Sequence, residues 1–176
     1  MSTFIQLPPR YNPGLYTQIV DGPTVGNTLV ETSVVGTGIG SLTIPANGFK
    51  VGDSFHAKIG GLITTQPNHT ITIKAKSDGT VLETTGVVTL EKATNQPWEL
   101  ELDFTIRSIG ATGVIKTNGN FIYNRNSGSY IGLALGDTEV FDTTVSNTLD
   151  ITVEWGQEDV TDSITVQQFI LYKTFI

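Results

Sequence analysis

The chain has 176 residues, a length that suits one domain. Only 15% of its residues are charged, fewer than the usual quarter, and Thr, Ser, Asn and Gly make up the difference, which is typical of strands and turns. The net charge of −7, with Lys and Arg scattered singly, argues against binding to nucleic acid, which requires a basic stripe. The lack of cysteine excludes disulfides, thiolate nucleophiles and cysteine-based metal sites.

The first ten residues, Met1–Arg10, lack the basic start and apolar run of a signal peptide. No stretch reaches the roughly 18 apolar residues of a membrane helix. We therefore expect a chain made in the cytoplasm and not inserted into a membrane. A protein without a signal peptide can reach the outside of a cell as part of a virus particle, which makes the virion its expected location.

Residues 1–24 differ from the rest of the chain. Pro8-Pro9, Pro13-Gly14 and Gly22-Pro23 interrupt them, with aromatic residues between. Proline fixes the backbone in extended or turn conformations. The pattern predicts an extended N-terminal arm that lies on the domain or on a neighbouring subunit. Residues 25–176 then form a single folded domain.

From residue 27 onward, apolar and polar residues alternate with a period of two, which indicates half-buried antiparallel strands. About ten short strands at intervals of 8–12 residues predict an all-β fold, a sandwich or a barrel, and of these we expect an antiparallel jelly-roll β-sandwich. The alternation is clearest in Trp98–Ile106 and Asn147–Trp155. The remaining predicted strands are Asn27–Val35, Ser41–Ile44, Asp53–Thr64, Thr70–Lys76, Gly79–Glu83, Gly86–Leu90, Gly113–Lys116, Asn120–Asn124, Ser129–Leu135, Glu139–Asp142 and Ser163–Phe175.

Turn signals separate these strands. Pro45-Ala46-Asn47-Gly48 and Ser77-Asp78-Gly79 are two of them, and Leu135-Gly136-Asp137 is a third. Asn118-Gly119 fits a two-residue type I′ hairpin, because both residues tolerate a positive φ. It predicts that the strands on its two sides pair with each other.

The segment at the end of the sequence, Phe169–Ile176, is apolar at successive positions and therefore on both faces of a strand. A strand of this kind needs cover on both sides, and an exposed edge would aggregate. A subunit interface supplies such cover, and so does the N-terminal arm. We therefore expect a closed oligomer, and specifically a homotrimer, because many such sandwiches close as threefold rings. The predicted interface residues are Phe169, Leu171, Tyr172, Phe175 and Ile176.

Candidate catalytic and metal-binding side chains are few. Glu99, Glu101 and Asp103 project from one strand face, where paired carboxylates would suit a glycosidase, but alternating charges are also the ordinary pattern of a solvated face. His56 is expected to face outward, and His69 lies in a turn, so nothing requires them to meet at a metal. We expect no enzymatic activity, no catalytic residue, no cofactor and no metal site.

Aromatic residues offer a ligand-binding alternative. Trp98 and Trp155 are in register with core residues and are expected to be buried. Tyrosine can stack on a sugar, and asparagine and arginine can hydrogen-bond to it. The loops around Tyr123-Asn124-Arg125 and Tyr130 therefore form a candidate ligand-contact site.

Three stretches carry a family resemblance: Ser41–Ile63, Trp98–Tyr123, and Asn147–Trp155 together with Ser163–Phe175. In this order they resemble jelly-roll domains of virion-associated proteins from large DNA viruses and of phage tail-fibre or knob proteins. Similar heads have the trimeric fold of complement C1q and tumour necrosis factor. The resemblance spans residues 24–176 and rests on turn and core residues. It implies a fold and carries no catalytic residues.

The first hypothesis is therefore a viral structural protein, a homotrimeric jelly roll of the virion or capsid. It would act at the particle surface in host attachment or cap another capsid protein. Its partners would be other copies of itself, other virion proteins, or a glycan or protein of the host surface. The alternative is a lectin-like carbohydrate-binding module. A third hypothesis, a glycoside hydrolase, requires two carboxylates facing each other across a cleft, about 5–10 Å apart.

Overall fold

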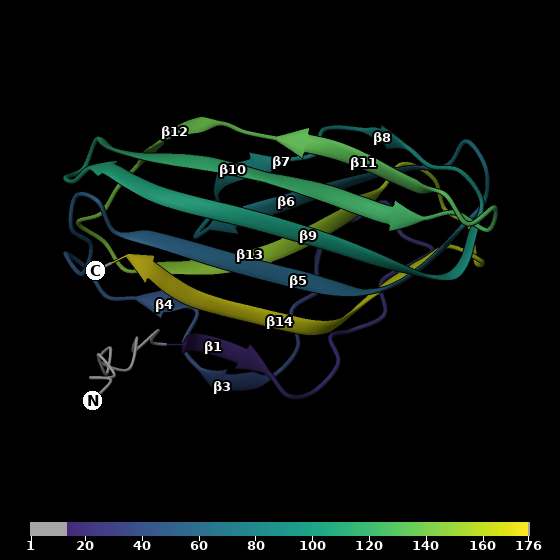
Figure 1. The fold of residues 1–176 in the computed structure, drawn as a ribbon, viewed down its shortest axis with the longest axis horizontal. Helices are drawn as coiled ribbons and strands as arrows, with labels where there is room; N and C mark the ends of the chain where they lie inside the picture. Colours follow the sequence, from purple (N-terminus) through teal and green to yellow (C-terminus); the bar gives the residue numbers. More distant parts are fainter. Residues whose placement is uncertain (1–13, 176) are drawn as a thin grey trace, which may run out of the picture.

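A computed structural model describes residues 14–175 and shows two antiparallel sheets packed face to face (Figure 1). The described residues contain 14 strands. Gly14–Gln18 and Gly38–Gly40 were not predicted, and the predicted strands Gly113–Lys116 and Asn120–Asn124 form one strand. No helix in this part of the chain is long and apolar enough to cross a bilayer. The strands are β1 (Gly14–Gln18), β2 (Thr32–Ser33), β3 (Gly38–Gly40), β4 (Thr43–Ile44), β5 (Ser54–Thr65), β6 (Thr70–Ser77), β7 (Thr80–Thr84), β8 (Val88–Thr89), β9 (Ala93–Ser108), β10 (Gly113–Asn124), β11 (Tyr130–Leu135), β12 (Thr138–Phe141), β13 (Asn147–Trp155) and β14 (Ser163–Phe175).

The strand order is that of a jelly roll. One sheet contains the order β1-β14-β5-β9 and the other contains β2-β13-β6-β7, so the chain crosses repeatedly from one layer to the other. The first sheet is extended by β3 beyond β1 and by β10, β11 and β12 beyond β9, which gives eight strands. β4 and β8 complete the six-stranded sheet. The predicted all-β sandwich is confirmed.

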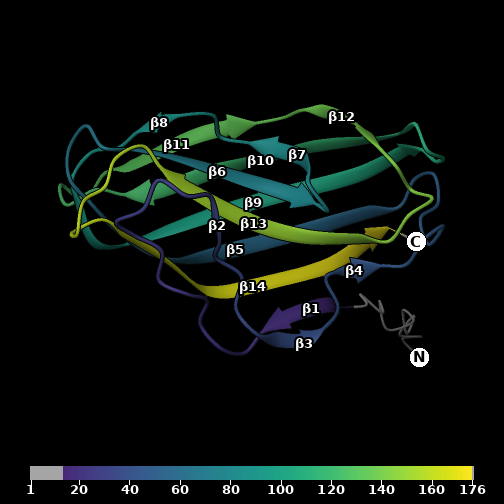
Figure 2. The ribbon, with the colours of Figure 1, turned by 180° about the vertical axis from the view of Figure 1, so that it is seen from behind.

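The core lies between the two layers, and Figure 2 shows β13, β6 and β7 lying over the long strands of the larger sheet. Every second residue of β9 from Trp98 to Ile106 is buried, as the alternation predicts. Trp98 and Trp155 are both core residues. The indole N–H of Trp98 donates to the backbone carbonyl of Thr165, and that of Trp155 donates to the backbone carbonyl of Val25. The two buried indoles therefore leave no polar group unpaired.

Of the predicted turns, the one at Asp78-Gly79 is confirmed and the one at Asn118-Gly119 is wrong. Asp78 and Gly79 have positive φ angles and join β6 to β7 as a two-residue hairpin. The predicted Asn118-Gly119 hairpin is wrong: both residues lie inside β10, where Asn118 pairs with Asp103 of β9. Gly119 instead permits a close approach, because a Cβ there would lie 1.9 Å from the carbonyl oxygen of Glu101. The glycine serves sheet packing and makes no turn.

The described part of the predicted N-terminal arm belongs to the sandwich. β1 pairs with β14 on one side and β3 on the other. Beyond β1, the Gly22 N–H donates to the Val166 carbonyl at 2.8 Å, and Val25 forms a bridge with Ile164. The chain therefore stays on the surface of its own domain through residue 25. Residues 1–13 of the arm lie outside the described residues.

Candidate functional site

The C-terminal strand lies inside the larger sheet and not at its edge. β14 is hydrogen-bonded to β5 on one side and β1 on the other. Phe169 and Leu171 are buried in the chain's own core, and the Phe169 ring packs edge-on against Tyr16 with centroids 5.4 Å apart. These two predicted interface residues are therefore core residues whose cover comes from the same chain. The side chains of Phe175 and Ile176 lie outside the described part.

The opposite side of β14 keeps apolar side chains near solvent. Ile170 and Tyr172 alternate with the core residues and are only half-buried. Ile170 pairs with Thr17 of β1, which in turn pairs with Ile39 of β3, so these three residues form one row across the outer surface. Ile39 is 64% exposed. We call Ile39, Ile170 and Tyr172 the β14 face.

The predicted ligand-contact residues separate in the structure. Tyr123 is fully buried, and its hydroxyl oxygen accepts a hydrogen bond from the backbone N–H of Glu91 at 2.9 Å. Burial raises the pKa of this phenol. Arg125 is held by an ion pair of 2.6 Å with the Glu91 carboxylate. Tyr123 is therefore a core residue and not a surface contact.

Asn124 and Tyr130 are brought together, because they pair across the β10–β11 ladder. Tyr130 is 70% exposed. It borders a shallow groove of about 240 Å³ on the outer surface of the larger sheet. Pro97, Glu99 and Ile122 form the rest of its outer lining. Of the four predicted residues, Tyr130 is the one that offers an open aromatic surface.

The carboxylates of β9 are neutralised on a solvated strand face. The ammonium of Lys58 lies 2.8 Å from Glu99 and 2.7 Å from Glu101. The hydrogen bond from Lys58 holds the pKa of Glu101 below its usual range, and the hydrogen bonds to Glu101 and Glu99 raise the pKa of Lys58. Asp103 contacts Nδ1 of His56 at 2.9 Å. These carboxylates lie side by side on one strand, without the facing arrangement that a glycosidase requires.

The two histidines serve separate contacts. His56 is outward, as expected, beside Lys58, and its ring lies 5.1 Å from that of Tyr172. His69 instead contacts the buried carboxylate of Asp162 at 2.7 Å, which ties two loops together. Within residues 14–175, no three acidic, histidine or cysteine side chains come together in a way that could hold a metal ion.

A charge network on the smaller sheet was not predicted. Glu31, from the loop before β2, contacts Lys74 at 2.6 Å and Lys76 at 2.7 Å. It also accepts a hydrogen bond from Thr152. The hydrogen bonds from the two lysines lower the pKa of Glu31 from 4.5 to about 2, and the bond from Lys74 has the larger effect. No local sequence pattern links a loop glutamate to lysines more than 40 positions away.

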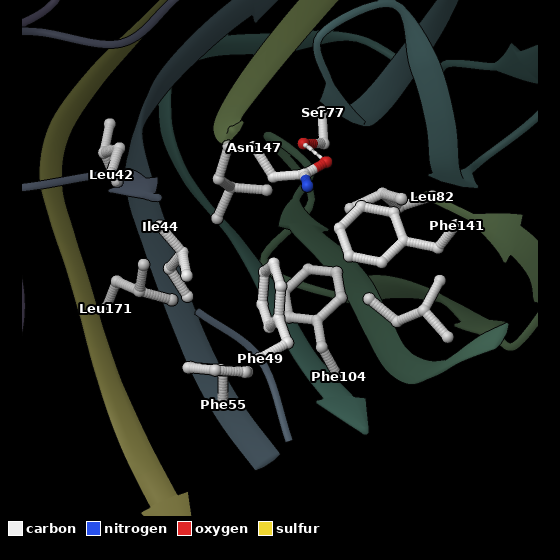
Figure 3. A pocket seen from close by; sticks show the side chains of 12 residues that line it. Leu42, Ile44, Phe49, Phe55, Ser77, Leu82, Phe104, Phe141, Asn147 and Leu171 are labelled. Atoms are coloured by element: carbon white, nitrogen blue, oxygen red, sulfur yellow. Dashed lines mark hydrogen bonds between the residues drawn. The ribbon is translucent and has the colours of Figure 1, made fainter. Parts of the chain in front are cut away.

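An apolar pocket lies between the sheets at one end of the sandwich (Figure 3). Figure 3 shows Phe49, Phe104 and Phe141 turned toward one another, and the Phe49 and Phe141 rings meet edge-on with centroids 5.3 Å apart. The two polar side chains of the lining satisfy each other, since the Ser77 hydroxyl donates to Asn147 at 3.0 Å. The free volume is about 50 Å³. The pocket is therefore a loosely filled part of the core with room for a small apolar group.

Comparison with known proteins adds little beyond the architecture. No protein-family model matches the chain, and no curated protein does. Among solved structures, a peanut lectin in complex with the nonapeptide PVIWSSATG matches with a TM-score of 0.38 and 7% identity, over 76% of each chain. A likeness this low carries no argument about ligand or activity. The resemblance to virion-associated jelly rolls therefore stays a prediction from the sequence.

Proposed function

We propose that this chain is a viral structural protein, a homotrimeric jelly roll that works through protein contact surfaces in or on the virus particle. The observation that carries the proposal is the β14 face, where the exposed Ile39 and the half-buried Ile170 and Tyr172 lie on a broad sheet. The virion setting and the threefold order rest on the family resemblance. In the particle, such a trimer would attach to a host surface or cap another capsid protein.

The β14 face has the composition of an interface centre. Protein interfaces are depleted of charge at their core and enriched in aromatic residues, with polar groups around them. Here Ile39, Ile170 and Tyr172 are the uncharged centre. The adjoining charges are already paired, because Lys58, next to Ile170 in the ladder, binds Glu99 and Glu101. A partner that covers the β14 face would therefore leave no free charge of this cluster without a counterion.

Light scattering on the full-length chain tests the proposal. We expect the mass of three chains, or a whole multiple of it, over a range of concentrations, and a smaller mass for Ile39→Lys, which places a charge in the interface. Val87→Lys is the matched control, since Val87 is 76% exposed and adjoins β8 on the other sheet. A wild-type protein that stays monomeric at every concentration contradicts the proposal, as does an Ile39→Lys variant that stays trimeric.

A second candidate function, carbohydrate binding, is favoured by the groove beside Tyr130. An exposed aromatic ring can stack on the apolar face of a sugar. Here Tyr130 lines the groove together with Ile122, Pro97 and Glu99. A glycan array with the wild-type chain and Tyr130→Ala tests it. Binding that is lost in the variant supports a lectin-like module, and signals at background for the wild type exclude it.

A further inference from the structure

The far margin of the larger sheet ends in an unprotected strand. β11, with the sequence YIGLAL, has no charged residue and no proline, and it pairs with β10 without a shift in register. Natural edge strands are normally blunted by charges, proline, bulges or covering segments. The opposite margin is blunted in this way, because β3 has three residues and Gly40 has a φ of 94°. Within the described residues, β10 is the only strand that pairs with β11.

The free hydrogen-bonding groups of β11 follow from the ladder. The backbone N–H of Arg125 donates to the backbone carbonyl of Ser129, and the backbone N–H of Thr117 donates to the backbone carbonyl of Asp137. Bonded pairs alternate in an antiparallel ladder, so residues 131, 133 and 135 direct their backbone groups to β10. The N–H and C=O groups of Tyr130, Gly132 and Ala134 therefore point away from the sheet. Three donors and three acceptors are presented at regular spacing along this edge.

We propose that β11 pairs antiparallel with β11 of a second copy of the chain, about a twofold axis at Gly132. In this register Gly132 lies opposite Gly132 of the partner subunit, and Tyr130 lies opposite Ala134 of the partner subunit. All three outward-pointing residues then fall at hydrogen-bonded positions, which gives six backbone hydrogen bonds by the alternation rule. The two eight-stranded sheets become one continuous sheet.

The side chains are self-complementary in the same register. On the outer face, the large ring of Tyr130 meets small residues, namely Ala134 of the partner subunit and the two central glycines. On the inner face, Leu133 lies opposite Ile131 of the partner subunit. Leu133 is 37% exposed and Tyr130 is 70% exposed, so both gain cover from the pairing. A second copy fits better than a charged partner, because the edge offers no charge to complement.

This contact uses the margin opposite the β14 face, so it does not depend on the proposed trimer. A single-cysteine experiment tests its register, because the natural chain has no cysteine. In a hydrogen-bonded antiparallel pair the Cα atoms lie about 5.5 Å apart, within disulfide range. Gly132→Cys should therefore form an intermolecular disulfide under mild oxidation. Ala134→Cys is the matched control on the same face, since the two copies of residue 134 would lie roughly 13 Å apart along the strands.

The expected result is a covalent dimer for Gly132→Cys and little or none for Ala134→Cys. Equal cross-linking of both variants, or cross-linking of neither, overturns the proposed register. Ala134→Pro tests the contact without cysteine, because it removes an N–H that points to the free edge and none that bonds to β10. We expect its mass in light scattering to fall to that of the species without the β11 contact, with an unchanged circular dichroism spectrum. An unchanged mass overturns the interface, whereas Ile39→Lys reports separately on the trimer.

Discussion

Replacing Phe169 by alanine separates a core role for the C-terminal strand from an interface role. The side chain is fully buried and packs edge-on against Tyr16. A buried Phe→Ala change costs about 3–5 kcal/mol through lost transfer free energy and the cavity left behind. Domains are stable by only about 5–15 kcal/mol. At about 2–4 °C per kcal/mol for a chain of this size, the melting temperature should fall by roughly 6–20 °C.

Urea unfolding measures this loss, with the fluorescence of buried Trp98 and Trp155 as the signal. The matched variant is Tyr172→Ala, three positions along β14, whose ring lies on the outer surface. We expect Tyr172→Ala to cost less than about 1 kcal/mol in the free energy of unfolding of the single chain. By the proposed function it should also reduce the mass in light scattering. If Phe169→Ala changed the mass and left the free energy of unfolding within about 1 kcal/mol of the wild type, the core placement would be refuted.

Three further predictions concern other parts of the sandwich. Glu31→Gln should destabilise the protein at pH 7 by about 1 kcal/mol. Because the folded pKa of Glu31 is lowered from 4.5 to about 2, this contribution is complete above pH 4.5 and is lost as the pH falls toward 2, so urea unfolding of both proteins should converge in acid. Asn118→Thr should leave the free energy of unfolding within about 0.5 kcal/mol of the wild type or raise it, since Asn118 lies in a strand, whereas a residue with positive φ would lose about 1–2 kcal/mol. Asn147→Ala should cost about 1–3 kcal/mol, because Asn147 is buried and donates to the carbonyls of Asp142 and Val145; a thermal melt showing no loss would mean that this amide is not buried.

The period-two pattern was sufficient to predict the layers of the fold. It identified the inward residues of β9 and β13, because a strand with one wet face must alternate. It placed β2, β4 and β8 inside longer predicted strands, since two-residue strands are too short to show their own limits, and it missed β1 and β3. Hairpin signals were less reliable. Asp78-Gly79 and Asn118-Gly119 look alike locally, but the strand β9 pairs with β10 through Asn118 and keeps it extended. The pairing with β9 is a tertiary contact that overrides the local turn signal, and the residues around Asn118 do not reveal it.

The candidate site was predicted in part. Tyr130 lies in the open, as a ligand-contact residue must, but Tyr123 turns inward because it shares the phase of Phe121 along β10. The alternation in Asn120–Asn124 already predicts that Tyr123 and Phe121 point to the same side of the strand. Two features could not be predicted: the ion pairs of Glu31 with Lys74 and Lys76, and the apolar pocket at the end of the sandwich. Both bring together residues that lie far apart in the sequence. The unprotected β11 edge becomes visible only when the order of strands in the sheet is known.

The position of β14 between β5 and β1 has a consequence for synthesis. Among the described strands β14 is translated after all the others, yet the larger sheet cannot join β1 to β5 without it. A nascent chain on the ribosome therefore holds two unpaired strand margins until β14 emerges. Contacts between distant segments form slowly, and such margins promote aggregation. Chains truncated before Ser163 should accumulate with chaperones or in inclusion bodies, so the synthesis of β14 acts as a checkpoint for folding.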